Sequence, residues 1–201
     1  MPPSAGIRTI QETLAQITMN LELFNKSFNS KQLLHQNVNG LETSNSELNS
    51  ILANFGGYSF DNGLFRIHNF HTSQKWTQII CETYPKYQNR ISAYGFDWLG
   101  RQFATDLNKD CTYMFDIATG EDYKLEQSLS DFFNIELIEY ADETLNIAGF
   151  QNWNTEKIEL SFDQVVAYKI PLLLGGKDSP ENYEIADAEV NWEINSQLKS
   201  K

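Results

Sequence analysis

A chain of 201 residues that is 41% hydrophobic and 13% aromatic has enough apolar material for one compact domain, because a chain of this length buries roughly 70% of its unfolded surface. The net charge of −12 is uneven: residues 1–101 carry 8 Lys and Arg against 7 Asp and Glu, and residues 102–201 carry 7 against 20. The acidic second half repels phosphate, which disfavours direct nucleic-acid binding. It attracts a basic protein partner, although the same charge could serve only to keep the protein in solution.

The remaining composition points to a reducing, cytoplasmic setting. Only two cysteines are present, Cys81 and Cys111, so no disulfide framework or Cys-x-x-Cys metal site is expected. The first residues lack the apolar core of a signal peptide, and no apolar run is long enough for a membrane span. We therefore expect no membrane association.

The first predicted elements are helical. Apolar residues at spacings of three and four predict an amphipathic helix over residues 7–24, and the Asn-, Ser- and Gln-rich residues 25–49 predict loosely held helix and linker. Ser46 is the expected N-cap of a short helix that ends at Gly56-Gly57. The predicted organisation is a helical N-terminal extension or linker over residues 1–45 and one domain over residues 46–201.

Strand signals dominate the middle of the chain, beginning at the tight-turn sequence Asp61-Asn62-Gly63. The elements predicted after it are a strand at 64–68, a helix at 73–84, hairpins at 91–107 and 113–125, a helix from Ser130 to Leu145, a buried central strand at 165–174 and a last strand at 190–194. This order predicts the α+β class, with a mainly antiparallel central sheet flanked by helices.

Two motifs that could carry chemistry are rejected on local grounds. Gly175-Gly176-Lys177 lacks the upstream glycine of a phosphate-binding loop and is followed by Asp178, so it is interpreted as a turn. His68 and His71 have no further ligand at metal spacing, even with Cys81 nearby. We expect no cofactor and no metal.

One pair of carboxylates, Asp97 and Asp106, flanks the hairpin centred on Leu99-Gly100. Such a pair could act as acid and base or bind a cation. Arg101 lies between them, and an Asp–Arg pair that braces the turn is the favoured interpretation. No catalytic set of residues is predicted.

Acidic clusters are the remaining candidates for function. Residues 116–143 contain nine carboxylates against Lys124, and residues 178–193 contain six with no Lys or Arg. Carboxylates around exposed aromatic side chains could form a docking face for a basic protein, whereas the alternative is a solvated surface. The predicted partner-binding residues are Asp178, Glu181, Tyr183, Glu184, Asp187 and Trp192.

Three phrases together resemble a bacterial family. They are FDNGLFRI at residues 60–67, AYGFDWLGRQFA at residues 93–104 and YKIPLLLGGKD at residues 168–178. In this order they are similar to the type VI secretion immunity proteins of the GAD-like kind, which are akin to the SUKH superfamily of toxin-neutralising proteins. The family-pattern residues are Asp97, Trp98, Arg101, Gly175 and Gly176, whose role could be folding alone.

The resemblance implies an α+β domain without catalytic activity that binds a cognate secreted toxin, often a nuclease. An acidic protein could occupy the basic cleft with which a nuclease holds DNA. Two other hypotheses stay open at this stage: an enzyme or small-ligand protein with a cleft near Asp97, Arg101 and Asp106, and a regulatory scaffold with a partner from the same cell.

Overall fold

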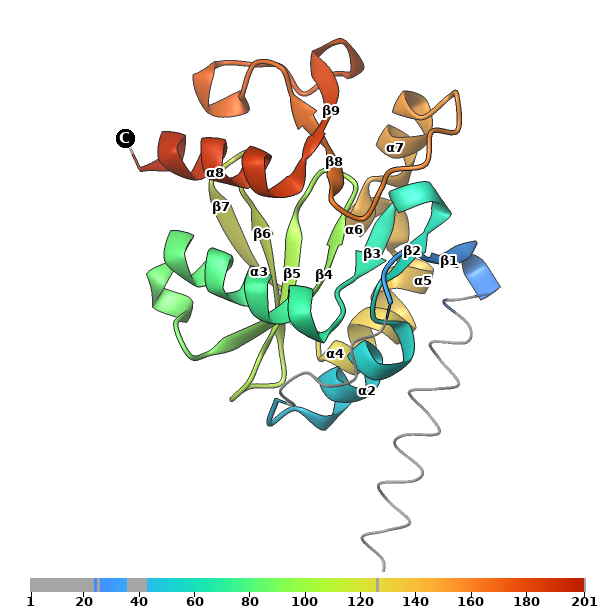
Figure 1. Ribbon diagram of the computed structural model, residues 1–201, viewed down its shortest axis with the longest axis vertical. Helices are drawn as coiled ribbons and strands as arrows, with labels where there is room; N and C mark the ends of the chain where they lie inside the picture. The colour runs from blue at the N-terminus through green and yellow to red at the C-terminus, as the bar shows by residue number, and fades with distance from the viewer. Residues whose placement is uncertain (1–23, 25, 36–42, 126, 201) are drawn as a thin grey trace, which may run out of the picture.

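The chain folds into an α+β structure whose main sheet is antiparallel (Figure 1). The computed structural model describes residues 24, 26–35, 43–125 and 127–200. Within them, seven strands form one sheet in chain order, β1-β2-β3-β4-β5-β6-β7, and two form a smaller antiparallel sheet. The predicted fold class is therefore confirmed. The expected helix over residues 7–24 lies almost entirely outside the described residues.

The strands are short, and β4, β5, β6 and β7 follow one another through short turns. Their bounds are β1 Ser30–Gln32, β2 Tyr58–Phe60, β3 Phe65–Ile67, β4 Ile91–Asp97, β5 Gln102–Asp106, β6 Thr112–Asp116, β7 Glu121–Leu125, β8 Gln164–Tyr168 and β9 Tyr183–Asp187. The helices are α2 Ser46–Phe55, α3 Phe70–Thr83, α4 Leu129–Asp131, α5 Leu137–Glu139, α6 Ala141–Leu145, α7 Ile147–Trp153 and α8 Ala188–Lys199.

Helices cover both faces of the main sheet, which creates two apolar cores. α3 and α8 pack on one face through residues such as Trp76 and Trp192. α2 and the segment from α4 to α7 contribute to the other core, together with Phe103 from the sheet. Phe24 is fully buried in this second core, and β1 pairs with β2, so residues inside the expected N-terminal extension belong to the sheet and its core.

Local signals explain the helix ends that the sequence predicted. Asn45, one residue before the predicted cap, accepts a hydrogen bond from the Leu48 amide, and α2 ends at Gly56. In α3, Asn69 and Thr72 form a capping box, so the helix starts three residues earlier than predicted and ends before Pro85.

The predicted single helix from Ser130 to Leu145 is wrong. Ser128 caps the segment, residues Phe132–Glu136 form a π turn, and the chain breaks at Tyr140 before α6. The wider π turn lets the adjacent side chains of Phe132 and Phe133 both enter the core.

The two predicted strands near the C-terminus are also corrected. β8 ends at Tyr168, because Pro171 and a turn at Leu172–Leu174 interrupt the apolar run. It pairs with β9 in the smaller sheet and is not a central strand of the main sheet. Residues 190–194, predicted as a strand, lie in α8. The Asp187 carboxylate caps that helix by accepting from the amides of Glu189 and Val190.

Candidate functional site

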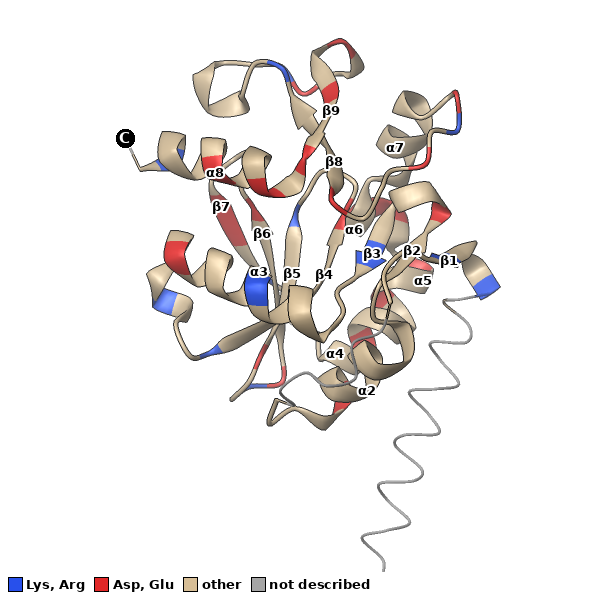
Figure 2. Ribbon diagram, viewed as in Figure 1, with Lys and Arg blue, Asp and Glu red and all other residues tan. Residues whose placement is uncertain are grey.

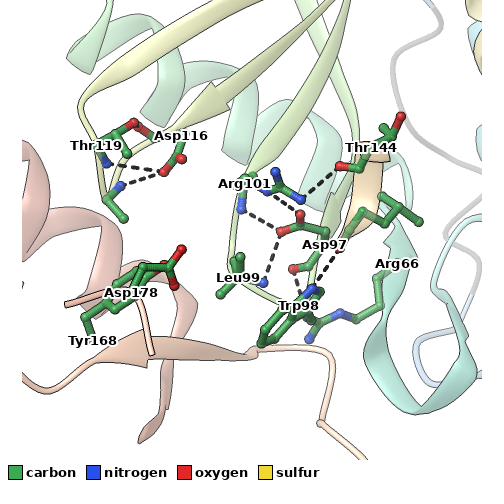
Figure 3. A network of polar contacts seen from close by, with 12 residues as sticks. Arg66, Asp97, Trp98, Leu99, Arg101, Asp116, Thr119, Thr144, Tyr168 and Asp178 are labelled. Carbon is green, nitrogen blue, oxygen red and sulfur yellow. Dashed lines mark hydrogen bonds and ion pairs between the residues drawn. The ribbon is translucent and has the colours of Figure 1, made fainter. Parts of the chain in front are cut away.

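The turn of the β4–β5 hairpin is braced by a buried ion pair, as predicted (Figure 3). One Asp97 carboxylate oxygen accepts from the amides of Leu99 and Arg101, each at 3.0 Å, and the other accepts from Arg101 Nε at 2.5 Å. Arg101 also donates to the Thr144 carbonyl at 2.9 Å, which ties the hairpin to α6. Burial alone would lower the pKa of Arg101, but the Asp97 carboxylate raises it above its usual value. Removal of either partner would leave the other as an unpaired buried charge, so the pair is a structural feature of the turn.

The expected shared cleft at Asp97, Arg101 and Asp106 does not form. Asp106 lies at the opposite end of the hairpin, where it pairs in register with Ile91. Its carboxylate accepts from Arg90 Nε at 2.8 Å, and its pKa is lowered because the Asn108 amide and Arg90 outweigh the effect of burial.

Arg66 is a buried charge that the sequence did not mark as special. Its guanidinium donates to the carbonyls of Ser161, Gln164 and Asp97 and lies over the Phe96 ring at 4.3 Å. Burial lowers the pKa of Arg66 to about 9, which leaves it charged at neutral pH. Arg66 therefore joins β3 to the turn of the hairpin and to the chain that enters β8.

The three family-like phrases lie near Trp98, the first in direct contact with it and the third through Tyr183. The Trp98 amide donates to Leu64 of the first phrase at 3.0 Å, and its carbonyl accepts from Val166 in β8 at 2.7 Å. Its ring packs on Tyr183, 5.8 Å away, which in turn packs on Tyr168 of the third phrase at 5.4 Å. The family-pattern residues Asp97, Trp98 and Arg101 thus have structural roles.

The Gly175-Gly176 pair lies in the loop that follows β8 and contributes to a turn there. Gly175 has a φ of +86°, and a side chain on Gly176 would begin 1.8 Å from the Ile170 carbonyl oxygen. The prediction of a turn is confirmed here.

The predicted partner-binding residues do not form a single face. The aromatic residues expected to be exposed are buried: Tyr183 is 8% exposed and Trp192 is 2% exposed. Trp192 packs on Trp76 and donates its indole N–H to Thr83 at 2.9 Å. The expectation of exposed aromatic anchors is wrong, because Tyr183 packs on Trp98 and Trp192 packs on Trp76.

The predicted acidic residues divide into two groups. Asp178 accepts from the hydroxyls of Tyr168 and Tyr183, and Asp187 is the cap of α8, so both carboxylates have structural partners. Glu181 and Glu184 project from the surface. Glu181 accepts local hydrogen bonds from its own amide and from Ser179, which lower its pKa, so Glu184 is the less engaged of the two.

A groove of about 590 Å³ lies between the starts of α3 and α8. Its walls include Trp76, Phe96 and Phe162. Ion pairs of Lys31 with Glu159, at 2.7 Å, and of Lys75 with Glu189 link elements along its rim. Among the described residues, no group of three His, Cys, Asp or Glu side chains is placed to hold a metal ion.

Comparisons with known proteins give a structural likeness but no family. No protein-family profile matches the chain, and no curated protein matches it. The structure is similar to the crystal structure of Atu4351 from Agrobacterium tumefaciens, with a TM-score of 0.57 and 18% sequence identity over 86% of each chain. At this identity the likeness shows a shared fold. No described helix is long and apolar enough to cross a membrane.

Proposed function

We propose that this chain is an immunity protein that binds a secreted toxin directly and neutralises it in the cytoplasm of the producing cell. The observation that carries the proposal is the proximity of the three phrases that resemble the type VI secretion immunity family. The first two phrases are hydrogen-bonded to each other at Trp98, and the third lies beside them through Tyr183, which packs on both Trp98 and Tyr168.

The charge distribution supports a basic toxin, and a nuclease is the class that needs a basic cleft. Residues 102–201 carry 20 Asp and Glu against 7 Lys and Arg. Their red positions spread over β7, β9 and α8 in Figure 2. Such a surface can compete with the phosphates of DNA, and charge complementarity accelerates the encounter of the two proteins.

The two alternative hypotheses have less support. An enzyme or small-ligand protein at Asp97, Arg101 and Asp106 would need these side chains in one cleft, but they lie at opposite ends of a hairpin. The hypothesis of a regulatory scaffold predicts that the partner is an endogenous protein of the same cell and not a secreted toxin. The identity of the partner therefore separates the scaffold from the immunity protein.

Co-expression tests the proposal. We expect this chain to restore growth to bacterial cells that express the toxin encoded by the neighbouring gene, and to co-purify with a catalytically inactivated form of that toxin. Co-expression of an unrelated acidic protein of similar size is the control, and it should leave growth arrested. Neither rescue nor co-purification with this chain would refute the proposed function.

A further inference from the structure

Exposed apolar side chains are concentrated near the C-terminal end of the fold. Ten large apolar side chains are exposed in the described residues, and six of them lie between residues 170 and 194. The most exposed is Leu174, at 63%, and it follows Leu173 on the loop between β8 and β9. Exposed aliphatic side chains in a cluster mark interaction sites more often than isolated ones do.

The loop lies next to α8, whose exposed apolar residues Val190 and Ile194 also line a groove beside α3. The turn Leu172–Leu174 contacts α8, and the loop lies over that helix in Figure 1. Val190 and Ile194 occupy one face of α8, four residues apart, and each is at least half exposed. We name the side chains of Ile170, Leu173, Leu174, Val190 and Ile194 the docking surface.

The loop is held rigidly although it contributes no side chain to either core. The Asn182 side chain accepts from the Ile170 amide and donates to the carbonyls of Ile170 and Lys177, all at 2.9 Å. Asp178 binds two tyrosine hydroxyls below the loop. A surface ordered in advance loses little conformational entropy when a partner binds, which favours tight association.

The charges around the docking surface indicate the chemistry of its partner. Glu181, Glu184 and Glu193 are exposed in the loop, in β9 and in α8. Two lysines, Lys169 and Lys177, are also on the loop, and Lys169 is engaged with the Glu181 carbonyl at 2.9 Å. Residues 169–194 therefore carry six carboxylates against two lysines. An apolar centre with an acidic rim complements an apolar recess that is edged by Lys and Arg.

We infer that the docking surface is the contact site for the basic toxin, with Leu173, Leu174 and Ile194 as its anchors. This inference rests on the proposed function and adds the location of the interface. The aliphatic side chains enter a recess on the toxin, while the glutamates face basic residues at its edge. Truncation of anchors at the centre of an interface has a far larger effect on affinity than changes at the rim.

Binding measurements with matched variants test the inference. The probe is the purified, catalytically inactivated toxin encoded by the neighbouring gene, and dissociation constants are measured with the full chain. The test variant combines Leu173→Ser, Leu174→Ser and Ile194→Ser. The control combines Ile135→Ser, Tyr140→Ser and Ile158→Ser, which removes side chains of comparable exposure elsewhere. Circular dichroism and thermal unfolding verify that both variants are folded.

We expect the test variant to bind about 100-fold more weakly, mainly through faster dissociation, and the control to stay within about threefold of the wild type. Equal affinities of the two variants, with a wild-type chain that binds, would overturn the docking surface and leave the immunity function intact. A wild-type chain that fails to bind would instead refute the proposed function and this inference with it.

Discussion

His68 is a titratable side chain in an apolar setting, between two aromatic residues of the α3-side core. Its ring stacks 4.9 Å from Phe96 and 6.2 Å from Trp76, and Nε2 donates to Gln102 at 3.0 Å. Burial lowers the pKa of His68 to about 3, and the nearby positive charge of Arg66 adds to the shift. The folded protein therefore keeps this ring neutral at mildly acidic pH.

His68 is predicted to make stability fall with acidification. The unfolded chain binds a proton at His68 below about pH 6.5, whereas the folded chain does not until about pH 3. The contribution of His68 to the free energy of unfolding is thus fully present above about pH 6.5 and is lost as pH falls towards 3. The loss amounts to about 2 kcal/mol at pH 5. Chemical denaturation at pH 7 and pH 5 measures this slope.

The variant His68→Gln should lose about 2 kcal/mol less of its free energy of unfolding between pH 7 and pH 5 than the wild type does. The variant His71→Gln, at an exposed position, should lose as much as the wild type. If His68→Gln and the wild type lose the same free energy of unfolding between pH 7 and pH 5, another group is responsible.

At the scale of elements, the loop between β8 and β9 depends on two glycines for different reasons. Gly175 needs only a positive φ and has open space beside it, whereas a side chain on Gly176 would collide with the Ile170 carbonyl. Gly175→Ala should therefore cost about 1 kcal/mol of local stability. Gly176→Ala should cost more, because the Asn182 hydrogen bonds must break for the backbone to move.

Hydrogen exchange of the Ile170 amide, which donates to Asn182, reports on this difference. We expect faster exchange in Gly176→Ala than in Gly175→Ala, with both variants globally folded. Equal exchange rates would mean that the loop tolerates the extra carbon without opening.

The sequence predicted elements best where the signal is local. Both hairpins of the main sheet, the end of α3 at Pro85 and the Asp97–Arg101 pair depend on residues close in the chain. The order Val190, Trp192, Ile194 imitates a strand, but the burial of Ala188, Trp192 and Asn195 follows a helical period. Asp187, a helix cap, was the local signal that could have decided between them.

The candidate site was less predictable because its geometry depends on distant contacts. Tyr183 is buried by Trp98, and Trp192 is buried by Trp76, at separations that no local pattern reports. The apolar run at residues 165–174 predicts a core strand, so the exposure of Leu173 and Leu174 does not follow from it. Pro171 before the run and Gly175 after it were the signals for a loop.

At the scale of the whole molecule, the position of the negative charge, as well as the net charge, should affect the rate of association with a basic partner. Charge reversal of Glu181, Glu184 and Glu193 avoids Asp187, whose loss would also uncap α8. We expect this variant to associate more slowly with the toxin and to show a weaker dependence of the association rate on salt. Stopped-flow or surface-plasmon measurements at several salt concentrations give both quantities.

The matched control reverses Asp110, Glu139 and Glu143, which are exposed and change the net charge by the same amount. It should retain most of the association rate. Equal slowing in both variants would show that the total charge, and not the docking surface, guides the encounter.

The edge strand β7 has a consequence for how copies of this protein behave together. Among the described strands it pairs only with β6, and its sequence is Glu-Asp-Tyr-Lys-Leu. Charged side chains along an open edge oppose strand addition by a second copy. We therefore expect the protein to resist sheet-mediated aggregation even in concentrated solution.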